Sequence, residues 1–268
     1  MSANNDSIQK TLMVAILLCL VCSIIVAGAA VSLKPNQLAN KQLDKNYNIL
    51  LAAGLASKEK MGREQIETAF KQITTRIVNL EAGRYATDAE LETIKAAGYN
   101  PSAYDQLKAS KDPALSASLP SDKDLANIRR LEKFAAVYTV ESNGVVEKMV
   151  LPVHGYGLWS TLYGFLALEG DLQTVVGLGF YSHGETPGLG GEVDNPAWKA
   201  LWNGKKLYND SGDLAIQVVK GKAAADDMNS VDGLSGATLT SNGVSNLVQF
   251  WVGENGFGKF LTTVKGGA

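Results

Sequence analysis

The sequence is poor in the residues that build metal sites and disulfides, because its 268 residues include only two cysteines and two histidines. Cys19 and Cys22 both lie in one apolar run near the N-terminus, so the rest of the chain cannot form a disulfide of its own. His154 and His183 have no cluster of cysteines beside them. A zinc site and a Ser-His-Asp hydrolase are therefore not indicated.

An excess of basic charge and the familiar phosphate-binding loops are also lacking. Lys and Arg number 25 against 27 Asp and Glu, which gives a net charge of −2 and predicts no nucleic-acid surface. No G-x-x-x-x-G-K-[ST] motif and no internal repeat occur. The hydrophobic fraction of 46% is ordinary for a globular protein.

Residues 12–33 form an uncharged apolar run of 22 residues. A helix needs about 20 residues to cross the hydrocarbon core of a membrane, so we predict a transmembrane helix there, after a short tail of residues 1–11. A cleaved signal peptide is the alternative, because Ala27-Gly28-Ala29 resembles a cleavage site. The run is longer than a typical signal-peptide core, which favours an uncleaved anchor.

Charge and cysteine spacing leave two features of this anchor open. Three lysines follow the run within residues 34–45 and only Lys10 precedes it, a pattern that by itself favours a cytoplasmic C-terminal domain. In a soluble protein, the Cys19-x-x-Cys22 spacing would suggest redox or metal chemistry. Inside an apolar span we interpret both cysteines as small apolar residues, with a metal cluster shared with another subunit as the alternative.

Residues 34–130 are predicted to form a helical stalk and an exposed excursion. The stalk covers residues 34–55, and apolar side chains then recur at helical spacing at Ile66, Phe70, Ile73, Ile77 and Leu80. A further helix is expected at residues 87–97. The stretch 101–123 is rich in Ser, Ala, Lys, Asp and Pro, so we expect an exposed segment without a functional site.

Residues 131–268 are predicted to form an α+β domain. Asn143-Gly144 is a strong hairpin signal between two strands, because both residue types tolerate positive φ. Strands are expected at 134–141, 145–150, 160–168, 172–180 and 214–219, with a helix at 196–202. This order predicts an antiparallel sheet flanked by helices.

A glycine-bearing turn at residues 232–241 leads into an apolar helical pattern near the C-terminus. Apolar side chains share one face of the expected helix, so Thr240 or Ser241 is predicted to cap it. The first N–H groups of a helix lack intrahelical partners and carry partial positive charge, which favours a phosphate. Thr238 presents a hydroxyl at this turn. A turn that merely caps a helix is the alternative interpretation.

A second uncommon segment, residues 182–191, contains four glycines and a proline. Such a composition predicts a loop with close backbone approach, but its glycine spacing does not fit G-x-G-x-x-G. By itself it indicates only a complex turn.

Together the two segments carry a family resemblance. Asp232-x-x-Ser235-Gly236-Ala237-Thr238 resembles the flavinylation signature of proteins that hold FMN through a phosphoester to the last threonine, and H-x-E-T-P-G-L-G from His183 resembles the flavin-binding loop of the same proteins. With the N-terminal anchor and Gly155-Tyr-Gly-Leu-Trp159, the whole chain resembles the C-subunit family of the Na+-translocating NADH:quinone oxidoreductases. The G subunit of the Rnf electron-transport complex is the nearest alternative, because it shares the anchor and both flavin motifs.

The resemblance implies a role for each matching residue. Thr238 would hold the FMN phosphate covalently, Trp159 and Leu189 would cover the isoalloxazine ring, and Lys220 would stabilise negative charge on reduced flavin. A Mg-dependent flavin transferase would take FMN from FAD and recognise the motif that includes Asp232. The remaining cofactor-binding residues implied are Ser235, Gly236, Ala237, Leu239, Thr240, Gly157, Leu158, His183, Glu185 and Thr186. His183 is expected to order its loop rather than transfer protons.

The function implied is that of a membrane-anchored electron-transfer subunit without an NADH or quinone site of its own. It would belong to an enzyme complex of the bacterial inner membrane that couples electron transfer from NADH to ubiquinone to sodium export, with the soluble domain in the periplasm. Its partners would be other subunits of the complex, the flavin transferase and membrane lipid. Nucleic acid is not expected to be a partner. The alternatives are a non-redox extracytoplasmic flavin-binding module and an envelope scaffold without flavin.

Overall fold

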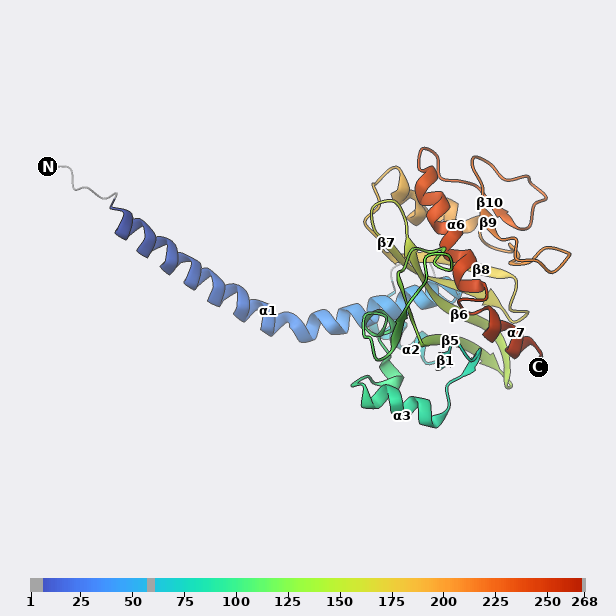
Figure 1. Ribbon diagram of the computed structural model, residues 1–268, viewed down its shortest axis with the longest axis horizontal. Coiled ribbons are helices and arrows are strands. Elements are labelled where there is room, and N and C mark those ends of the chain that lie inside the picture. Colours follow the sequence, from blue (N-terminus) through green and yellow to red (C-terminus); the bar gives the residue numbers. More distant parts are fainter. Residues whose placement is uncertain (1–6, 57–60, 267–268) are drawn as a thin grey trace. The chain divides into compact units, whose positions relative to one another are not determined.

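The computed structural model describes residues 7–56 and 61–266 (Figure 1). By internal contacts the chain divides into two compact units, Met1–Lys45 and Asn46–Ala268. Part of the predicted N-terminal tail, residues 1–6, lies outside the described residues.

The predicted membrane span and stalk lie on one continuous helix, α1 (Ile8–Ala52), which contains Pro35. Large apolar side chains in its first half are exposed, as at Leu17 and Ile25. By length and composition α1 is able to cross a membrane. Both cysteines are exposed on it as free thiols.

The second unit is built on a six-stranded antiparallel sheet with the strand order β2-β1-β5-β6-β7-β8. The sheet strands are β1 (Ile73–Asn79), β2 (Arg84–Tyr85), β5 (Phe134–Ser142), β6 (Val145–Tyr156), β7 (Thr161–Glu169) and β8 (Val175–Ser182). The predicted hairpin is confirmed between β5 and β6, where Asn143 and Gly144 have φ values of 53° and 81°. This architecture confirms the predicted α+β class with an antiparallel sheet.

The single amphipathic helix predicted from Ile66 to Leu80 is wrong in its second half. A short helix, α2 (Arg63–Phe70), is followed directly by β1. Most residues of β1 are β-branched, a type of side chain that favours a pleated strand, namely Ile73, Thr74, Thr75, Ile77 and Val78. Pairing of β1 with β5 along its whole length, with Ile77 opposite Ala136, overrides the helical spacing.

The segment between β2 and β5 consists of short elements rather than open coil. The helix predicted at residues 87–97 is confirmed as α3 (Asp88–Ala96), and Thr87 caps it by accepting a hydrogen bond from Glu90 N. The following elements are η1 (Pro101–Ala103), α4 (Gln106–Ala109), β3 (Ser116–Ser118) and β4 (Arg130–Glu132), of which β3 and β4 pair antiparallel.

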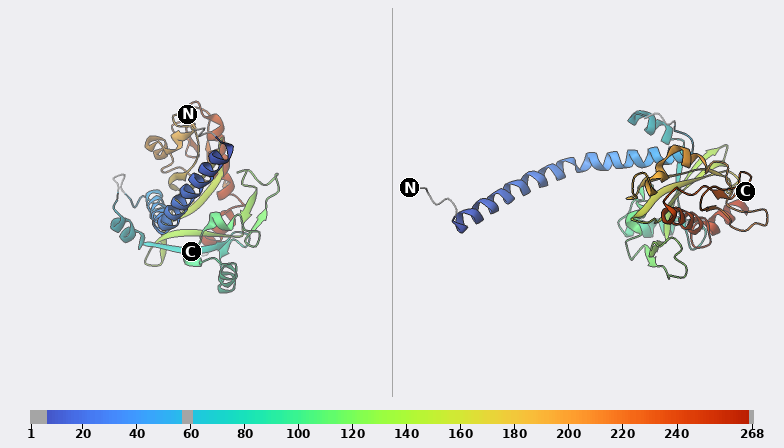
Figure 2. Two further views of the ribbon diagram at one scale, coloured as in Figure 1. Left: turned by 90° about the vertical axis from the view of Figure 1, so that its left-hand side faces the viewer. Right: turned by 90° about the horizontal axis from the view of Figure 1, so that it is seen from above.

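Both faces of the sheet are covered, which explains the nearly continuous burial along β7. α6 (Thr238–Val252) and α7 (Gly258–Gly266) lie on one face of the sheet (Figures 1 and 2). Leu247 of α6 packs so closely against β6 that a Cβ on Gly155 would lie 2.9 Å from the Cβ of Leu247. On the other face the end of α1 is anchored by Lys148, whose Nζ donates to Ala53 O at 2.9 Å. The sheet therefore fixes the position of α6.

The connection from β8 to α6 contains η2 (Gly190–Asp194), α5 (Pro196–Ala200), β9 (Gln217–Val218) and β10 (Ser230–Val231). The predicted helix at 196–202 and strand at 214–219 correspond to α5 and to the shorter β9, which pairs parallel with β10 outside the main sheet. β1 and β2, which precede residue 131, belong to the same sheet as β5 to β8. The domain boundary placed between residues 130 and 131 stays a prediction.

Candidate functional site

Thr238 is the first residue of α6 and is exposed. The N-cap is Ala237, whose side chain provides no capping hydrogen bond, so the prediction that Thr240 or Ser241 caps the helix is wrong. Both lie inside the first turn and are buried. The N-terminus of α6 is thus a place where backbone N–H groups and the helix dipole are available to an anion beside an exposed hydroxyl.

The turn before Thr238 is fixed by Ser241. Its hydroxyl accepts a hydrogen bond from Leu234 N at 2.9 Å and donates to Ala237 O at 3.1 Å. Gly236, between them, has a φ of 71°, a region that favours glycine. A Cβ at Gly236 would lie 3.1 Å from Leu189 Cδ2, so the glycine also lets the second loop close over the turn.

Three large apolar side chains from the three motif segments are exposed. Trp159 is 66% exposed, Leu239 is 59% exposed and Leu189 is 45% exposed. Leu239 follows Thr238 directly, and Leu189 lies beside the turn that precedes it.

Glu185 joins the three segments. Its carboxylate accepts a hydrogen bond from Trp159 N at 3.0 Å and from the hydroxyl of Thr240 at 2.6 Å. The residue is only 5% exposed. The segment 157–160, the loop 183–191 and the first turn of α6 therefore meet at one buried carboxylate.

Glycines make this close meeting sterically possible. A Cβ on Gly157 would lie 2.6 Å from Glu185 Oε1, and one on Gly190 would lie 2.5 Å from Thr240 Oγ1. A Cβ on Gly243, in the second turn of α6, would lie 2.6 Å from Tyr156 O. Gly190 and Gly243 are site residues that the sequence reasoning missed, although a glycine inside an apolar helix is a signal of close packing.

His183 makes two contacts that hold the loop 183–191. Its Nε2 lies 2.8 Å from Asp194 Oδ2, and its Nδ1 accepts a hydrogen bond from Glu185 N at 3.2 Å. Because Nδ1 is the acceptor, the neutral ring carries its proton on Nε2. Asp194 and Ser160, whose hydroxyl accepts from Gly184 N, are further contributors that the sequence did not reveal. The side chain of Thr186 is exposed.

Asp232 holds the loop that carries Lys220. Its Oδ1 accepts a hydrogen bond from Ala223 N at 2.9 Å, and its backbone oxygen accepts from Trp198 Nε1 at 2.8 Å. Lys220 itself is exposed. The structure thus connects Lys220 to the motif through Asp232, while Ser235 is exposed on the turn between Asp232 and Thr238.

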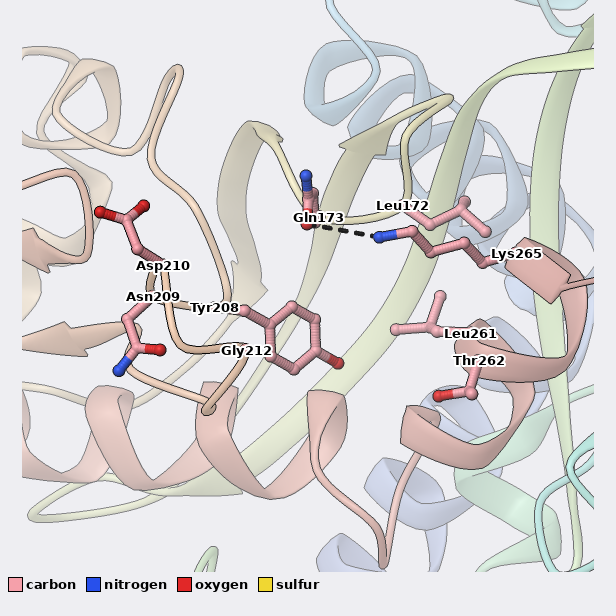
Figure 3. A pocket seen from close by; sticks show the side chains of 9 residues that line it. All are labelled: Leu172, Gln173, Tyr208, Asn209, Asp210, Gly212, Leu261, Thr262 and Lys265. Carbon is pink, nitrogen blue, oxygen red and sulfur yellow. Dashed lines mark hydrogen bonds between the residues drawn. The ribbon is translucent and has the colours of Figure 1, made fainter.

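A separate pocket of about 330 Å³ lies between the turn after β7 and α7 (Figure 3). Lys265 and Gln173 meet across it at 3.4 Å, beside Tyr208 and Leu261. None of the residues predicted to bind the cofactor lines this pocket, so it is distinct from the surface around Thr238.

Comparison with known proteins identifies the family. Residues 157–253 match the model of the FMN-binding domain, a range that covers the segment 157–160, the loop 183–191 and α6. Over 268 residues the chain is 53% identical to the C subunit of the Na(+)-translocating NADH-quinone reductase of Pseudomonas aeruginosa, with 99% of each chain covered. This chain belongs to that C-subunit family. The predicted resemblance is thereby confirmed, and it favours this family over the Rnf alternative.

Other members of the C-subunit family match most of this chain in sequence or in fold. The Yersinia pestis member is 47% identical, with 99% of this chain and 96% of the relative covered. The crystal structure of Shewanella oneidensis NqrC superimposes with a TM-score of 0.73 at 35% identity and covers 85% of this chain and 99% of that one. The crystal structure of the Parabacteroides distasonis member gives a TM-score of 0.64 at 27% identity, with 86% and 97% covered.

Proposed function

We propose that this chain is a membrane-anchored electron-transfer subunit that carries FMN covalently on Thr238, within a Na+-translocating NADH-quinone reductase. The observation that carries the proposal is the exposed Thr238 at a helix N-terminus without a side-chain cap, with the exposed side chains of Leu239 and Leu189 beside it. The family match at residues 157–253 supports the same cofactor.

The residues around Thr238 fit the phosphate of FMN. The N-terminus of α6 offers N–H groups without intrahelical partners and partial positive charge, and Ser235, Gly236 and Ala237 add a small-residue turn that a bulky group can approach. Thr238 supplies the oxygen of the phosphoester. The one carboxylate of the motif, Asp232, is engaged with Ala223 N and so is turned to the neighbouring loop.

The exposed side chains of Trp159, Leu189 and Leu239 fit the ring system of the same cofactor. A flat aromatic ring gains both apolar contact and stacking from such side chains. Leu158, half-buried beside Trp159, belongs to the same segment. When bound, FMN supplies the redox chemistry, and the protein tethers it, orients it and sets its electrostatic surroundings. Lys220 adds a positive charge from the loop that Asp232 holds.

The anchoring and partners of the chain follow the same proposal. α1 is proposed to cross the membrane once and to remain uncleaved, with the folded domain in the periplasm, where the flavin transferase implied by the family works. The relatives are named as subunits of a sodium-translocating reductase, so the proposed partners are the other subunits of such a complex. Sodium export is proposed as a property of that complex, because one apolar helix cannot by itself form an ion pathway.

The experiment that tests the proposal is co-expression of the full chain with a Mg-dependent flavin transferase, followed by intact mass under denaturing conditions. We expect a mass increase equal to FMN minus water and a yellow chain. Dithionite should reduce the flavin and bleach its visible absorbance, and reoxidation by air should restore that absorbance. An adduct that cannot be reduced reversibly would instead indicate a non-redox flavin-binding module. A colourless chain of unmodified mass, made with an active transferase, would refute the proposal.

Asp232 gives a further prediction about maturation. Asp232→Asn keeps Oδ1 as the acceptor for Ala223 N, whereas Asp232→Ala releases the loop that carries Lys220. Losing a hydrogen bond to a charged group costs roughly 1.5–3 kcal/mol, so we expect flavin transfer to Asp232→Ala to slow roughly tenfold or more, and transfer to Asp232→Asn to stay near the wild-type rate. The check is the initial rate of adduct formation by intact mass. Equal slowing of both variants would show that the transferase reads the negative charge instead.

A further inference from the structure

Glu185 belongs to a motif whose residues are expected to touch the flavin, but its carboxylate is already fully occupied. Oε1 lies within hydrogen-bond distance of three backbone donors, Leu158 N at 3.2 Å, Trp159 N at 3.0 Å and Ser160 N at 3.3 Å. Oε2 accepts from Leu158 N at 3.3 Å and from Thr240 Oγ1 at 2.6 Å. Two carboxylate oxygens have about four acceptor positions, so no position is left for a ligand.

The three amides form a concave anion-binding nest at the turn between β6 and β7. Gly157 N donates to Ser160 O at 2.8 Å and closes this turn, so the three N–H groups that follow point to one side. Such a nest binds anions from solution in other proteins. Here the anion is the protein's own side chain, delivered from the loop 183–191.

The charge state of Glu185 agrees with this geometry. Burial alone would raise the pKa of the carboxyl, but the hydrogen bonds from Thr240 and from the three amides outweigh burial and hold its pKa below the usual value. The group is therefore ionised at neutral pH, and each of its hydrogen bonds is charge-assisted.

From these contacts we infer that Glu185 is a positioning residue: it fixes the Trp159 turn against the first turn of α6, and so sets where the exposed indole stands relative to the Thr238 oxygen. Trp159 is held through its own backbone N–H, and Thr240 is held two residues after Thr238 on the same helical turn. The glycines at 157, 190 and 243 bring the three segments to this separation. The inference deepens the proposed function and, for its flavin measurements, rests on it.

The test compares four single variants of the detergent-solubilised full chain, and the double variant of Glu185→Gln with Thr240→Val, with wild type. Glu185→Gln removes the charge and turns an N–H₂ group toward the amide donors. Thr240→Val removes one donor with little change in shape, and Thr240→Ser restores the hydroxyl. Ile94→Ala, which removes a buried side chain in α3, is the control for general loss of stability.

The first readout needs no flavin. Hydrogen exchange by mass spectrometry follows the amides of residues 158–160 in the unloaded chain. Each charge-assisted hydrogen bond protects its amide from exchange. We therefore expect the exchange of these amides to be roughly ten- to a hundredfold faster in Glu185→Gln than in wild type. Thr240→Ser and Ile94→Ala should leave these amides as in wild type.

The second readout uses the flavin-loaded chain. Glu185→Gln and Thr240→Val are expected each to slow flavin transfer to Thr238 and to shift the visible circular dichroism and midpoint potential of the flavin, with the double variant no worse than Glu185→Gln alone. Thr240→Ser should restore wild-type values, and Ile94→Ala should leave the potential unchanged. Coupled effects of this kind are expected only if the two side chains act as one contact.

The outcomes separate the two claims. Unchanged exchange at residues 158–160 in Glu185→Gln, or strictly additive effects with Thr240→Val, would overturn the positioning role and favour direct contact of Glu185 with the flavin. An equal change of potential in Ile94→Ala would overturn it as well. Absence of flavin from the wild-type chain would instead refute the proposed function. The exchange measurement, which needs no flavin, would then still test the positioning role of Glu185.

Discussion

Replacing Thr238 by alanine is expected to abolish covalent flavin attachment completely while the fold is retained. The side chain is exposed at the start of α6, and alanine is a better helix former than threonine. The free energy of unfolding should therefore change by no more than about 0.5 kcal/mol. The mass increase of the co-expressed wild-type chain should be absent from the variant under denaturing conditions.

Neighbouring hydroxyls should not substitute for Thr238. Thr240 and Ser241 are buried, and each is engaged in hydrogen bonds that hold the site together. Ser235 is the exposed hydroxyl on the same turn, so the peptide mass of the Ser235→Ala variant should place any adduct that forms on Thr238. Thr238→Ser, which keeps an oxygen at the same position, should keep it in part. An adduct of unchanged amount in Thr238→Ala, or a peptide mass that places it on another residue, would contradict the assignment.

Local sequence signals predicted the elements whose structure is decided locally. Asn143 and Gly144 both adopt positive φ, as the hairpin between β5 and β6 requires. Thr87 caps α3 and is paired with Glu90 in a capping box. These residues act within a few positions of themselves, so a single sequence contains the information that they use.

Elements decided by distant partners were predicted less well. The spacing of Ile73 and Ile77 fits a helix, but both residues lie on β1 because β5 offers a complete row of partners, Ile73 opposite Val140 for example. That row belongs to a strand far along the chain, beyond β2, α3 and the β3–β4 pair. Helical periodicity over so short a window could not be weighed against it.

The same limit applies to the candidate site. The motifs mark the three segments that meet at Glu185. Each of these segments carries an exposed residue of the candidate site, namely Trp159, Leu189 and Thr238. The start of α6 was misplaced because the hydroxyl of Thr240 bonds to Glu185, a residue 55 positions away, instead of to its own helix. Hydrogen bonds that tie loops together leave no periodic trace in a sequence, so the internal anion of the site became visible only in three dimensions.

A second large effect is expected at Glu132, a carboxyl that no sequence motif marks. Glu132 ends β4 and is 1% exposed. Gln106 Nε2 donates to its Oε1, whereas Oε2 has no hydrogen-bond partner within the described part of the chain. Burial raises the pKa of this carboxyl from its usual 4.5 to about 7, although the hydrogen bond from Gln106 opposes the rise.

This raised pKa makes the fold less stable as the pH increases. Between pH 4.5 and 7 the folded state holds a proton on Glu132 that the unfolded state has released, so the contribution of this group to the unfolding free energy falls across this window and is constant on either side. The separation of the two pKa values corresponds to about 3 kcal/mol. Buried neutral Glu132 is tolerated at low pH, and the buried charge is what destabilises the fold at high pH.

Glu132→Gln is therefore expected to stabilise the chain at pH 8 by up to about 3 kcal/mol and to change little at pH 4.5. The glutamine keeps an oxygen that accepts from Gln106 and cannot ionise. Urea unfolding of the detergent-solubilised chain, followed by tryptophan fluorescence at both pH values, measures the difference. Glu81→Gln, which removes an exposed carboxylate, should leave the pH profile unchanged. An equal effect of Glu132→Gln at the two pH values would mean that packing, and not the ionisation of this carboxyl, determines its contribution to stability.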